Sequence, residues 1–280
     1  VRMQDQLFPQ GCAYEVFCAK HAGESRLKLR QTVITSLKQK SEASWKGIAE
    51  TVKKSEEQGA VTRVRRYWIV NGFACVATGK ACAEFAQHDR VSFVYRQRLP
   101  RAAPLHARPK TPLHAPQQRQ AVYAGVLQQW EAKEEPLTLD GVAVPWNIKR
   151  IKADQAWVKE AATGTGVIVA LCDTGMMIAP ALVRALWKNP AEQLNGKDDD
   201  NNGYVDDLFG YDFNLQSWYA LGDSPTMTHG SMCAGIIAGR PLNKRKLITG
   251  VAPRARLMIL RGMGHLAQYE YALANGASVM

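Results

Sequence analysis

An aspartate and a histidine, 56 positions apart, carry the clearest chemical potential in this sequence. Asp173 follows a β-favouring run over 167–171 and precedes a Thr-Gly turn, whereas His229 begins a stretch of small residues. A buried strand that ends in a carboxylate presents it at the carboxyl edge of a parallel sheet, where open α/β folds bind their ligands. An imidazole held by a carboxylate can serve as the base for a hydroxyl nucleophile. The two residues thus predict two thirds of an Asp-His-Ser hydrolase, although each alone also fits a structural role.

A second candidate site is the acidic stretch 198–207. Its carboxylate and amide side chains alternate along the chain and Gly203 permits a sharp turn, as in the first nine positions of an EF-hand calcium loop. The twelfth position is Phe209 rather than the usual glutamate. We therefore keep two interpretations, a calcium site and a polar surface turn. The candidate calcium ligands are Asp198, Asp200, Asn202 and Asp206.

Composition limits the other classes of function. The 280 residues allow one large or two modest domains, and no apolar run reaches the roughly 18 residues of a membrane-spanning helix. The net charge of +11 lies wholly in residues 1–150, which hold 24 Lys and Arg against 13 Asp and Glu, whereas residues 151–280 hold 12 of each. Because these charges are scattered and no nucleic-acid motif accompanies them, we expect neither a nucleic acid nor a membrane as partner.

The six cysteines form no Cys-x-x-Cys pair, so neither a zinc ribbon nor a thioredoxin motif is expected. Cys172 and Cys233 lie in apolar segments and are interpreted as buried small side chains. No secretory signal peptide is visible. The chain begins at Val1 and ends inside a predicted strand, so we expect both ends to be fragment ends.

The first half predicts a small α+β module over 41–98, preceded by an unassigned segment, 1–40. Ser41 or Ser44 is the expected N-cap of its first helix. The pattern predicts a helix over 41–58, a strand pair over 61–77, a helix over 80–88 and a strand over 91–95.

The second half is preceded by a basic segment, 99–144, whose recurring prolines predict an extended linker that proteases can cut. From residue 145 to residue 280, helices and strands alternate, which predicts a parallel sheet covered by helices. The expected helices lie at 154–162, 180–187, 230–238 and 267–275, and the expected strands at 167–171, 256–260 and 277–280.

Five blocks of this second half occur in the order typical of subtilisin-like serine peptidases. They are residues 146–157, 164–175, 229–237, 250–257 and 271–279. The chain from Trp146 to Met280 therefore resembles the first half of a member of the subtilase family. The resemblance implies a partial three-layer fold with a parallel sheet and helices on both faces. It also implies that Asp173 orients His229, that His229 acts as the base, and that the substrate is a protein or peptide. It further implies a secreted or cell-surface location and catalysis that requires no cofactor.

The chain departs from the family pattern in three places. Ser231 and Met232 replace the Thr and second His of the usual His-Gly-Thr-His block, and the stretch 176–180 lacks the usual second Asp and His-Pro pair. The Gly-Thr-Ser-Met-Ala nucleophile block and the oxyanion Asn do not occur in the 280 residues. We expect the serine beyond residue 280 and predict that this fragment alone is inactive. The alternative is a catalytically inactive subtilase-like interaction protein, and a further one is an unrelated doubly wound α/β protein.

The first-half module has its own counterpart in the family. Residues 66–76 and 89–94 resemble the strand pair and last strand of the N-terminal propeptide of subtilases. The resemblance implies an intramolecular propeptide, with its tail added as a strand in the substrate cleft and a processing site in the linker. The alternative is an unrelated binding module.

Overall fold

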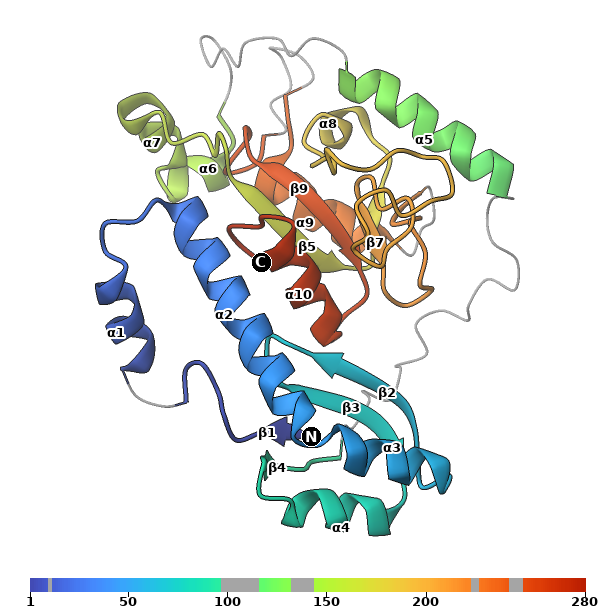
Figure 1. Ribbon diagram of the computed structural model, residues 1–280. Helices are drawn as coiled ribbons and strands as arrows, with labels where there is room; N and C mark the ends of the chain where they lie inside the picture. Colours follow the sequence, from blue (N-terminus) through green and yellow to red (C-terminus); the bar gives the residue numbers. More distant parts are fainter. Residues whose placement is uncertain (10–11, 97–115, 132–143, 223–226, 242–248) are drawn as a thin grey trace. The chain divides into compact units, whose positions relative to one another are not determined.

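The computed structural model describes residues 1–9, 12–96, 116–131, 144–222, 227–241 and 249–280 (Figure 1). The chain divides into two compact units, Val1–Ala103 and Pro104–Met280. Among the described residues, no helix combines the length and the apolar character needed to cross a membrane.

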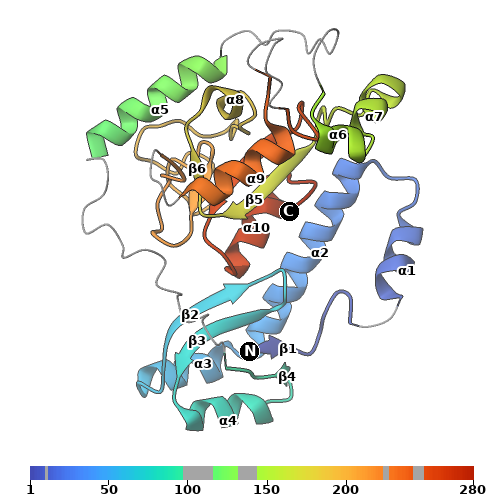
Figure 2. The ribbon, with the colours of Figure 1, turned by 180° about the vertical axis from the view of Figure 1, so that it is seen from behind.

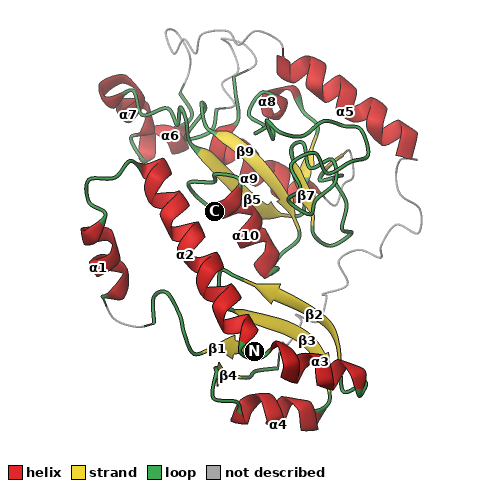
Figure 3. Cartoon of the chain, in the orientation of Figure 1, coloured by secondary structure: helices red, strands yellow, loops and turns green. Residues whose placement is uncertain are grey.

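The first unit is an antiparallel sheet with helices. Its elements are β1 (Arg2–Met3), α1 (Ala13–Lys20), α2 (Arg26–Lys46), α3 (Ala49–Glu57), β2 (Val61–Tyr67), β3 (Gly72–Ala77), α4 (Gly79–Gln87) and β4 (Val91–Phe93). The strand order is β2-β3-β1-β4 (Figure 3). Apolar side chains from α3, β3 and α4, among them Val52, Phe73 and Phe85, form its core.

The helix expected over 41–58 is wrong in its boundaries. The chain forms two helices there, because α2 ends before Gly47 and α3 begins at Ala49. The N-cap of α2 is Ser25, whose side chain accepts a hydrogen bond from Lys28 N–H, whereas Ser41 and Ser44 are buried inside the helix. The preceding residues, 26–40, are rich in Leu, Lys, Arg and Gln, which are good helix formers and extend α2 toward the N-terminus.

The second unit contains a parallel sheet of order β5-β9-β7. Its elements are α5 (Pro116–Glu131), α6 (Trp146–Arg150), α7 (Ala153–Glu160), β5 (Ile168–Asp173), β6 (Met176–Met177), α8 (Pro180–Val183), β7 (Gly210–Asp212), β8 (Leu221–Gly222), α9 (Thr228–Ala238), β9 (Arg256–Arg261) and α10 (Leu266–Ala274). Every residue of β5 pairs with β9, from Ile168 opposite Arg256 to Asp173 opposite Arg261. The strand expected at 277–280 is reduced to one parallel bridge, between Val169 and Val279.

Helices cover both faces of this sheet. Helix α10 lies in front of β5 and β9 in Figure 1, and α9 lies in front of them when the molecule is seen from behind (Figure 2). Strand β9 is central, and its residues Leu257 to Leu260 are buried. This arrangement agrees with the predicted α/β class of a parallel sheet with helices on both faces.

Part of the expected linker is helical. Residues 116–131 form α5, in which Tyr123 and Val126 are buried in the core of the second unit. Trp130 Nε1 donates a hydrogen bond to the carbonyl oxygen of Leu186 at 2.8 Å. The apolar residues follow a helical spacing, and this stripe buries one face of the helix. The rest of the expected linker, 99–115 and 132–143, lies outside the described residues.

Candidate active site

Asp173 is placed by the end of β5. Its carbonyl oxygen accepts a hydrogen bond from Gly262 N–H at 2.8 Å, which extends the pairing between β5 and β9. The next residue, Thr174, donates its backbone N–H to Asp173 Oδ1 at 2.6 Å. Gly175 follows with φ +97°, a value that glycine adopts at little cost. The turn therefore holds a buried carboxylate, with 7 % of the residue exposed, at the carboxyl edge of the sheet.

His229 is the second residue of α9, and Gly230 brings that helix against the turn. A Cβ atom at Gly230 would lie 2.0 Å from the carbonyl oxygen of Gly175, so any larger residue would force the two segments apart. Gly230 N–H also donates to Thr174 Oγ1 at 3.1 Å. The small residues that follow His229 thus allow the close approach that the imidazole needs.

The structure brings the two predicted residues together. His229 Nδ1 lies 2.9 Å from Oδ1 and 2.8 Å from Oδ2 of Asp173. Burial raises the pKa of Asp173, but hydrogen bonds from Thr174 and His229 outweigh it and hold the pKa below its ordinary value. An ionised carboxylate at Nδ1 favours the tautomer with its proton on that nitrogen, which leaves Nε2 as the basic atom.

The imidazole is open on its other side. The side chain of His229 is 67 % exposed. The hydrogen bonds found for its ring among the described residues all involve Nδ1. Nε2 is thus available to a hydroxyl group or to solvent.

Two side chains of nucleophilic type lie near the pair without facing Nε2. Cys233 Sγ is 3.8 Å from His229 Nδ1, the nitrogen that Asp173 already binds. Burial raises the pKa of the Cys233 thiol, and the charge of Asp173 adds to the effect. Ser231 Oγ donates to the carbonyl of Met227 and accepts from Met177 N–H, so it serves the backbone. The sequence signal for Cys233 is its i+4 spacing from His229, since such residues share one face of a helix.

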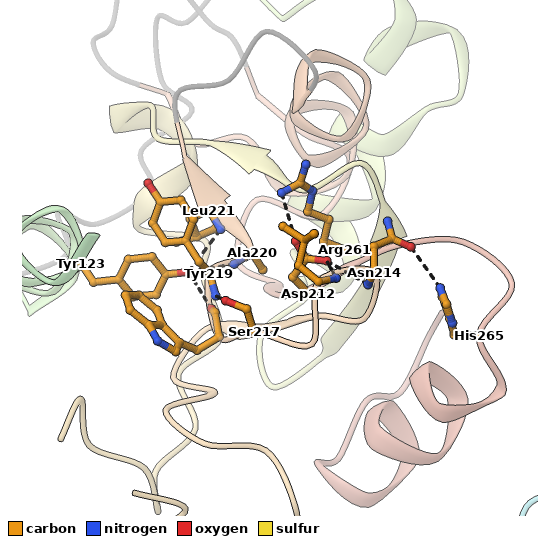
Figure 4. Close-up of polar contacts among 11 residues, drawn as sticks. Tyr123, Asp212, Asn214, Ser217, Tyr219, Ala220, Leu221, Arg261 and His265 are labelled. Carbon is orange, nitrogen blue, oxygen red and sulfur yellow. Dashed lines mark hydrogen bonds and ion pairs between the residues drawn. The ribbon is translucent and has the colours of Figure 1, made fainter. Parts of the chain in front are cut away.

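The neighbouring strand ends carry an ion pair that the sequence interpretation missed. Arg261 Nη1, at the end of β9, lies 3.0 Å from Asp212 Oδ2, at the end of β7 (Figure 4). Asp212 is fully buried, and burial raises its pKa against the opposing effects of Arg261 and of the N–H groups of Leu215 and Asn214. Asn214 Oδ1 also contacts His265 Nε2 at 3.0 Å. Asp212 and Arg261 each end a β-strand, as Asp173 does. A charged residue at a strand end is therefore the sequence feature that could have identified this ion pair.

Tyr123 anchors the segment before β8. Its hydroxyl oxygen accepts hydrogen bonds from the N–H groups of Ala220 and Leu221, both at 3.2 Å, and it donates to the carbonyl of Trp218 at 3.1 Å (Figure 4). Burial raises the pKa of Tyr123 well above its ordinary value, so the hydroxyl stays protonated and can donate. Strand β8 in turn pairs with β6, which directly follows the Asp173 turn.

The structure brings together three of the four expected calcium ligands, Asp198, Asp200 and Asn202. One oxygen from each of Asp198 and Asp200 lies within 4.8 Å of the other, and Glu192, which the sequence interpretation missed, contributes a third oxygen within the same distance. Asn202 lies in the same loop, where its Nδ2 donates to Asp200 Oδ2 at 3.0 Å and its Oδ1 accepts from Tyr204 N–H.

Asp206 lies apart from this cluster in its hydrogen bonding. Its Oδ1 accepts from the N–H groups of Asn195 and Gly196, both at 2.8 Å. Its backbone has φ +56°, in the left-handed region, so the chain changes direction there. Although Asp206 belongs to the acidic pattern of the sequence, its side chain therefore does not join those of Asp198 and Asp200.

Comparison with known proteins places this site in a family. The family profile Peptidase_S8, described as the subtilase family, matches residues 164–278. Bacillopeptidase F of Bacillus subtilis (strain 168) is 24% identical over 247 residues, which are 86% of this chain and 15% of that protein. Mycosin-1 of Mycobacterium tuberculosis (strain ATCC 25618 / H37Rv) is 35% identical over 129 residues, which are 45% of this chain and 23% of that protein. The chain thus spans less than a quarter of the length of either relative.

Solved mycosin structures are also similar in part. The crystal structure of MycP1 with its N-terminal propeptide removed is 28% identical and covers 48% of this chain and 33% of its own, with a TM-score of 0.30. MycP1 from Mycobacterium smegmatis is 26% identical and covers 46% of this chain and 26% of its own, with a TM-score of 0.26.

Residues 164–278 are similar to the subtilisin-like family. The matched region contains both members of the Asp173–His229 pair. The pair is at ion-pair distance, 2.8 Å, which removes the alternative of an unrelated α/β protein with an isolated strand-end aspartate.

Proposed function

We propose that this chain is part of a subtilisin-like serine endopeptidase that cleaves peptide bonds in proteins. The observation that carries the proposal is the contact between His229 Nδ1 and the buried carboxylate of Asp173, with the rest of the imidazole open. The match of residues 164–278 to the subtilase family supports the same reaction class.

In the proposed mechanism, Asp173 holds His229 with its proton on Nδ1. His229 Nε2 then takes the proton of a serine hydroxyl while the serine oxygen attacks the carbonyl carbon of the scissile peptide bond. The imidazolium gives this proton to the leaving amine as the C–N bond breaks, and water hydrolyses the acyl-enzyme by the same route. Asp173 stabilises the positive imidazolium that each step creates. We place the serine and the oxyanion Asn beyond residue 280, from the order of blocks in the family.

We further propose that residues 41–98 act as an intramolecular propeptide. The first unit, which contains these residues together with β1, has its own apolar core and a four-stranded antiparallel sheet, as a separately folding inhibitory domain requires. A secreted or cell-surface location is proposed on the same family resemblance.

The alternative is a catalytically inactive subtilase-like interaction protein. The observation that favours it is the altered surroundings of His229, where Ser231 and Met232 replace the usual residues and Met232 is 58% exposed. The two proposals differ in whether the whole protein contains a serine nucleophile.

The coding frame beyond Met280 provides the first test. We expect it to continue into an oxyanion Asn and a Gly-Thr-Ser-Met-Ala block. A frame that stops close to residue 280 would contradict the peptidase proposal and favour the interaction protein.

The second test uses the polypeptide encoded by the whole frame. A fluorophosphonate probe should label its serine, and His229→Ala should lower kcat on a peptide substrate by at least about 10³-fold. His21→Ala, in the first unit, serves as the control and should leave kcat unchanged. Equal turnover by the His229→Ala variant and the wild type would refute the assigned base.

A further inference from the structure

The hydroxyl group of Tyr123 directs all of its described hydrogen bonds to one short segment of backbone. It accepts from the N–H groups of Ala220 and Leu221, and it donates to the carbonyl of Trp218 (Figure 4). Tyr123, Ala220 and Leu221 are each 0% exposed, so bulk water does not compete for these groups. A buried backbone group without a partner is unfavourable. The hydroxyl therefore fixes where the segment 218–221 lies.

That segment is bonded directly to the turn that carries Asp173. Met176 N–H, three residues after Asp173, donates to the carbonyl oxygen of Ala220 at 3.2 Å. A Cβ atom at Gly175 would lie 2.8 Å from the same oxygen, so the turn and the segment are in close contact. Strands β6 and β8 contain two residues each, and a two-stranded sheet this small needs support from outside it. Tyr123 supplies that support to β8.

The same small sheet is also bonded to α9, the helix that carries His229. Met177 N–H donates to Ser231 Oγ at 2.8 Å, and Ser231 lies two residues after His229. Strand β6 is thus held by β8 through its pairing and by α9 through this serine. The backbone that Tyr123 fixes therefore contacts the elements that place both members of the Asp173–His229 pair.

We propose that Tyr123 is a positioning residue for the Asp173–His229 pair. Its described hydrogen bonds reach neither residue, so it acts through the backbone of β8 and β6. The inference rests on the proposed function, because it concerns how the proposed catalytic pair is oriented. An error of about 1 Å in the position of a catalytic group can lower the rate by about 10²-fold. A cut that removes α5 would therefore remove part of the support of the active site.

The chain offers a matched control in the same helix. Trp130, also in α5, donates its Nε1–H to the carbonyl of Leu186 at 2.8 Å. Leu186 bridges to Leu257, near the start of β9, rather than to β6 or β8. Trp130→Phe thus removes hydrogen bonding between α5 and buried backbone, as Tyr123→Phe does, but leaves the small sheet untouched. A difference between the two variants separates positioning of the pair from a general loosening of α5.

Nitrogen NMR of labelled histidine in the 280-residue chain measures the tautomer of His229 and requires no serine nucleophile. The His229→Ala variant identifies the signals. At a pH at which the ring is neutral, the wild type should carry its proton mainly on Nδ1, the nitrogen that Asp173 binds. Tyr123→Phe should raise the fraction with the proton on Nε2 by at least about twofold, whereas Trp130→Phe should leave it unchanged. Equal fractions in the wild type and Tyr123→Phe, or equal changes in both variants, would overturn the proposal.

The polypeptide encoded by the whole frame gives a second readout. Tyr123→Phe should lower kcat on a peptide substrate by about tenfold and keep KM within about twofold, because it disturbs the catalytic pair rather than substrate binding. Trp130→Phe should keep both constants within about twofold. An equal fall in kcat for the two variants would overturn the proposal. If the wild-type polypeptide does not cleave peptides, the proposed function fails, and the tautomer comparison still decides whether Tyr123 orients the pair.

A further variant covers the case in which Tyr123→Phe does not fold. Ser231→Ala removes the acceptor of Met177 N–H and so breaks the contact between β6 and α9. It should also raise the fraction of His229 with its proton on Nε2. An unchanged tautomer in a folded Ser231→Ala variant would overturn the proposal, because the effect of Tyr123 has to pass through β6.

Discussion

At the scale of single residues, the surroundings of Asp173 decide what it can do. Burial favours the neutral acid, whereas the Thr174 N–H and the His229 ring favour the carboxylate, and these hydrogen bonds prevail. The residue therefore stays negative at the pH at which a neighbouring imidazole acts as a base. Without these hydrogen bonds, burial would favour the neutral acid, and a neutral acid stabilises an imidazolium poorly.

The depressed pKa of Asp173 predicts how stability depends on pH. Its folded pKa lies below the unfolded value of about 3.9, so its stabilising contribution is fully present above that pH and is lost as pH falls through the folded pKa. Carbon NMR of the labelled Asp173 carboxyl should show a titration midpoint below 3.9, and the Asp173→Asn variant assigns the signal. A midpoint at or above 3.9 would contradict the hydrogen bonding described for this carboxylate.

At the scale of elements, the approach of α9 to the end of β5 determines whether the pair can form. Gly230 lies where a Cβ would be 2.0 Å from a backbone oxygen, but at Gly235, five residues later in the same helix, a Cβ would meet no described atom within 4 Å beyond its chain neighbours and the backbone of its own helix. The two glycines thus have different physical roles, although they share a helix and a residue type. Gly230 permits a contact, whereas Gly235 lowers the helix propensity.

This contrast gives a matched pair of substitutions. Gly230→Ala should destabilise the second unit by about 2 kcal/mol or more, since the clash involves backbone that cannot move cheaply. Gly235→Ala should stabilise it by up to about 1 kcal/mol. Urea unfolding of both variants measures the difference, and equal effects of the two substitutions would show that the close approach at Gly230 does not exist.

At the scale of the whole molecule, each of the two compact units has its own large apolar core among the described residues. One contains Phe73 and Phe85, and the other contains Tyr123 with the central strand β9. Helix α5 belongs to the second core through the Tyr123 hydroxyl, which has three backbone partners. The two units are therefore expected to unfold as separate cooperative units.

Calorimetry should resolve two unfolding transitions that respond to different substitutions. Tyr123→Phe should lower the free energy of unfolding of the second unit alone, by about 1–3 kcal/mol, because it leaves buried backbone groups without a partner. Phe85→Leu, in the core of the first unit, should lower the free energy of unfolding of the first unit alone. A single transition that both variants shift would show that the units unfold together.

Local patterns were sufficient to find the candidate pair. Asp173 ends a strand and His229 lies in the first turn of a helix, and both features depend on residues that are neighbours in the chain. Helix α5 was missed because prolines dominate the composition around it, although Tyr123, Val126 and Trp130 follow a helical spacing. The continuous helix over 41–58 was wrong because the stop at Gly47 outweighs the polar pattern on either side.

The sequence alone determined the strand that ends in Asp173, the helix whose first turn contains His229 and the alternating oxygens of the acidic loop. Only the tertiary structure decided that Nδ1 of His229 meets the Asp173 carboxylate, and that Glu192 rather than Asp206 joins Asp198 and Asp200. The physical reason is the range of the interactions. Periodicity and turn chemistry act over a few residues, whereas these contacts depend on strand register, on the approach of α9 and on the direction of the backbone at Asp206.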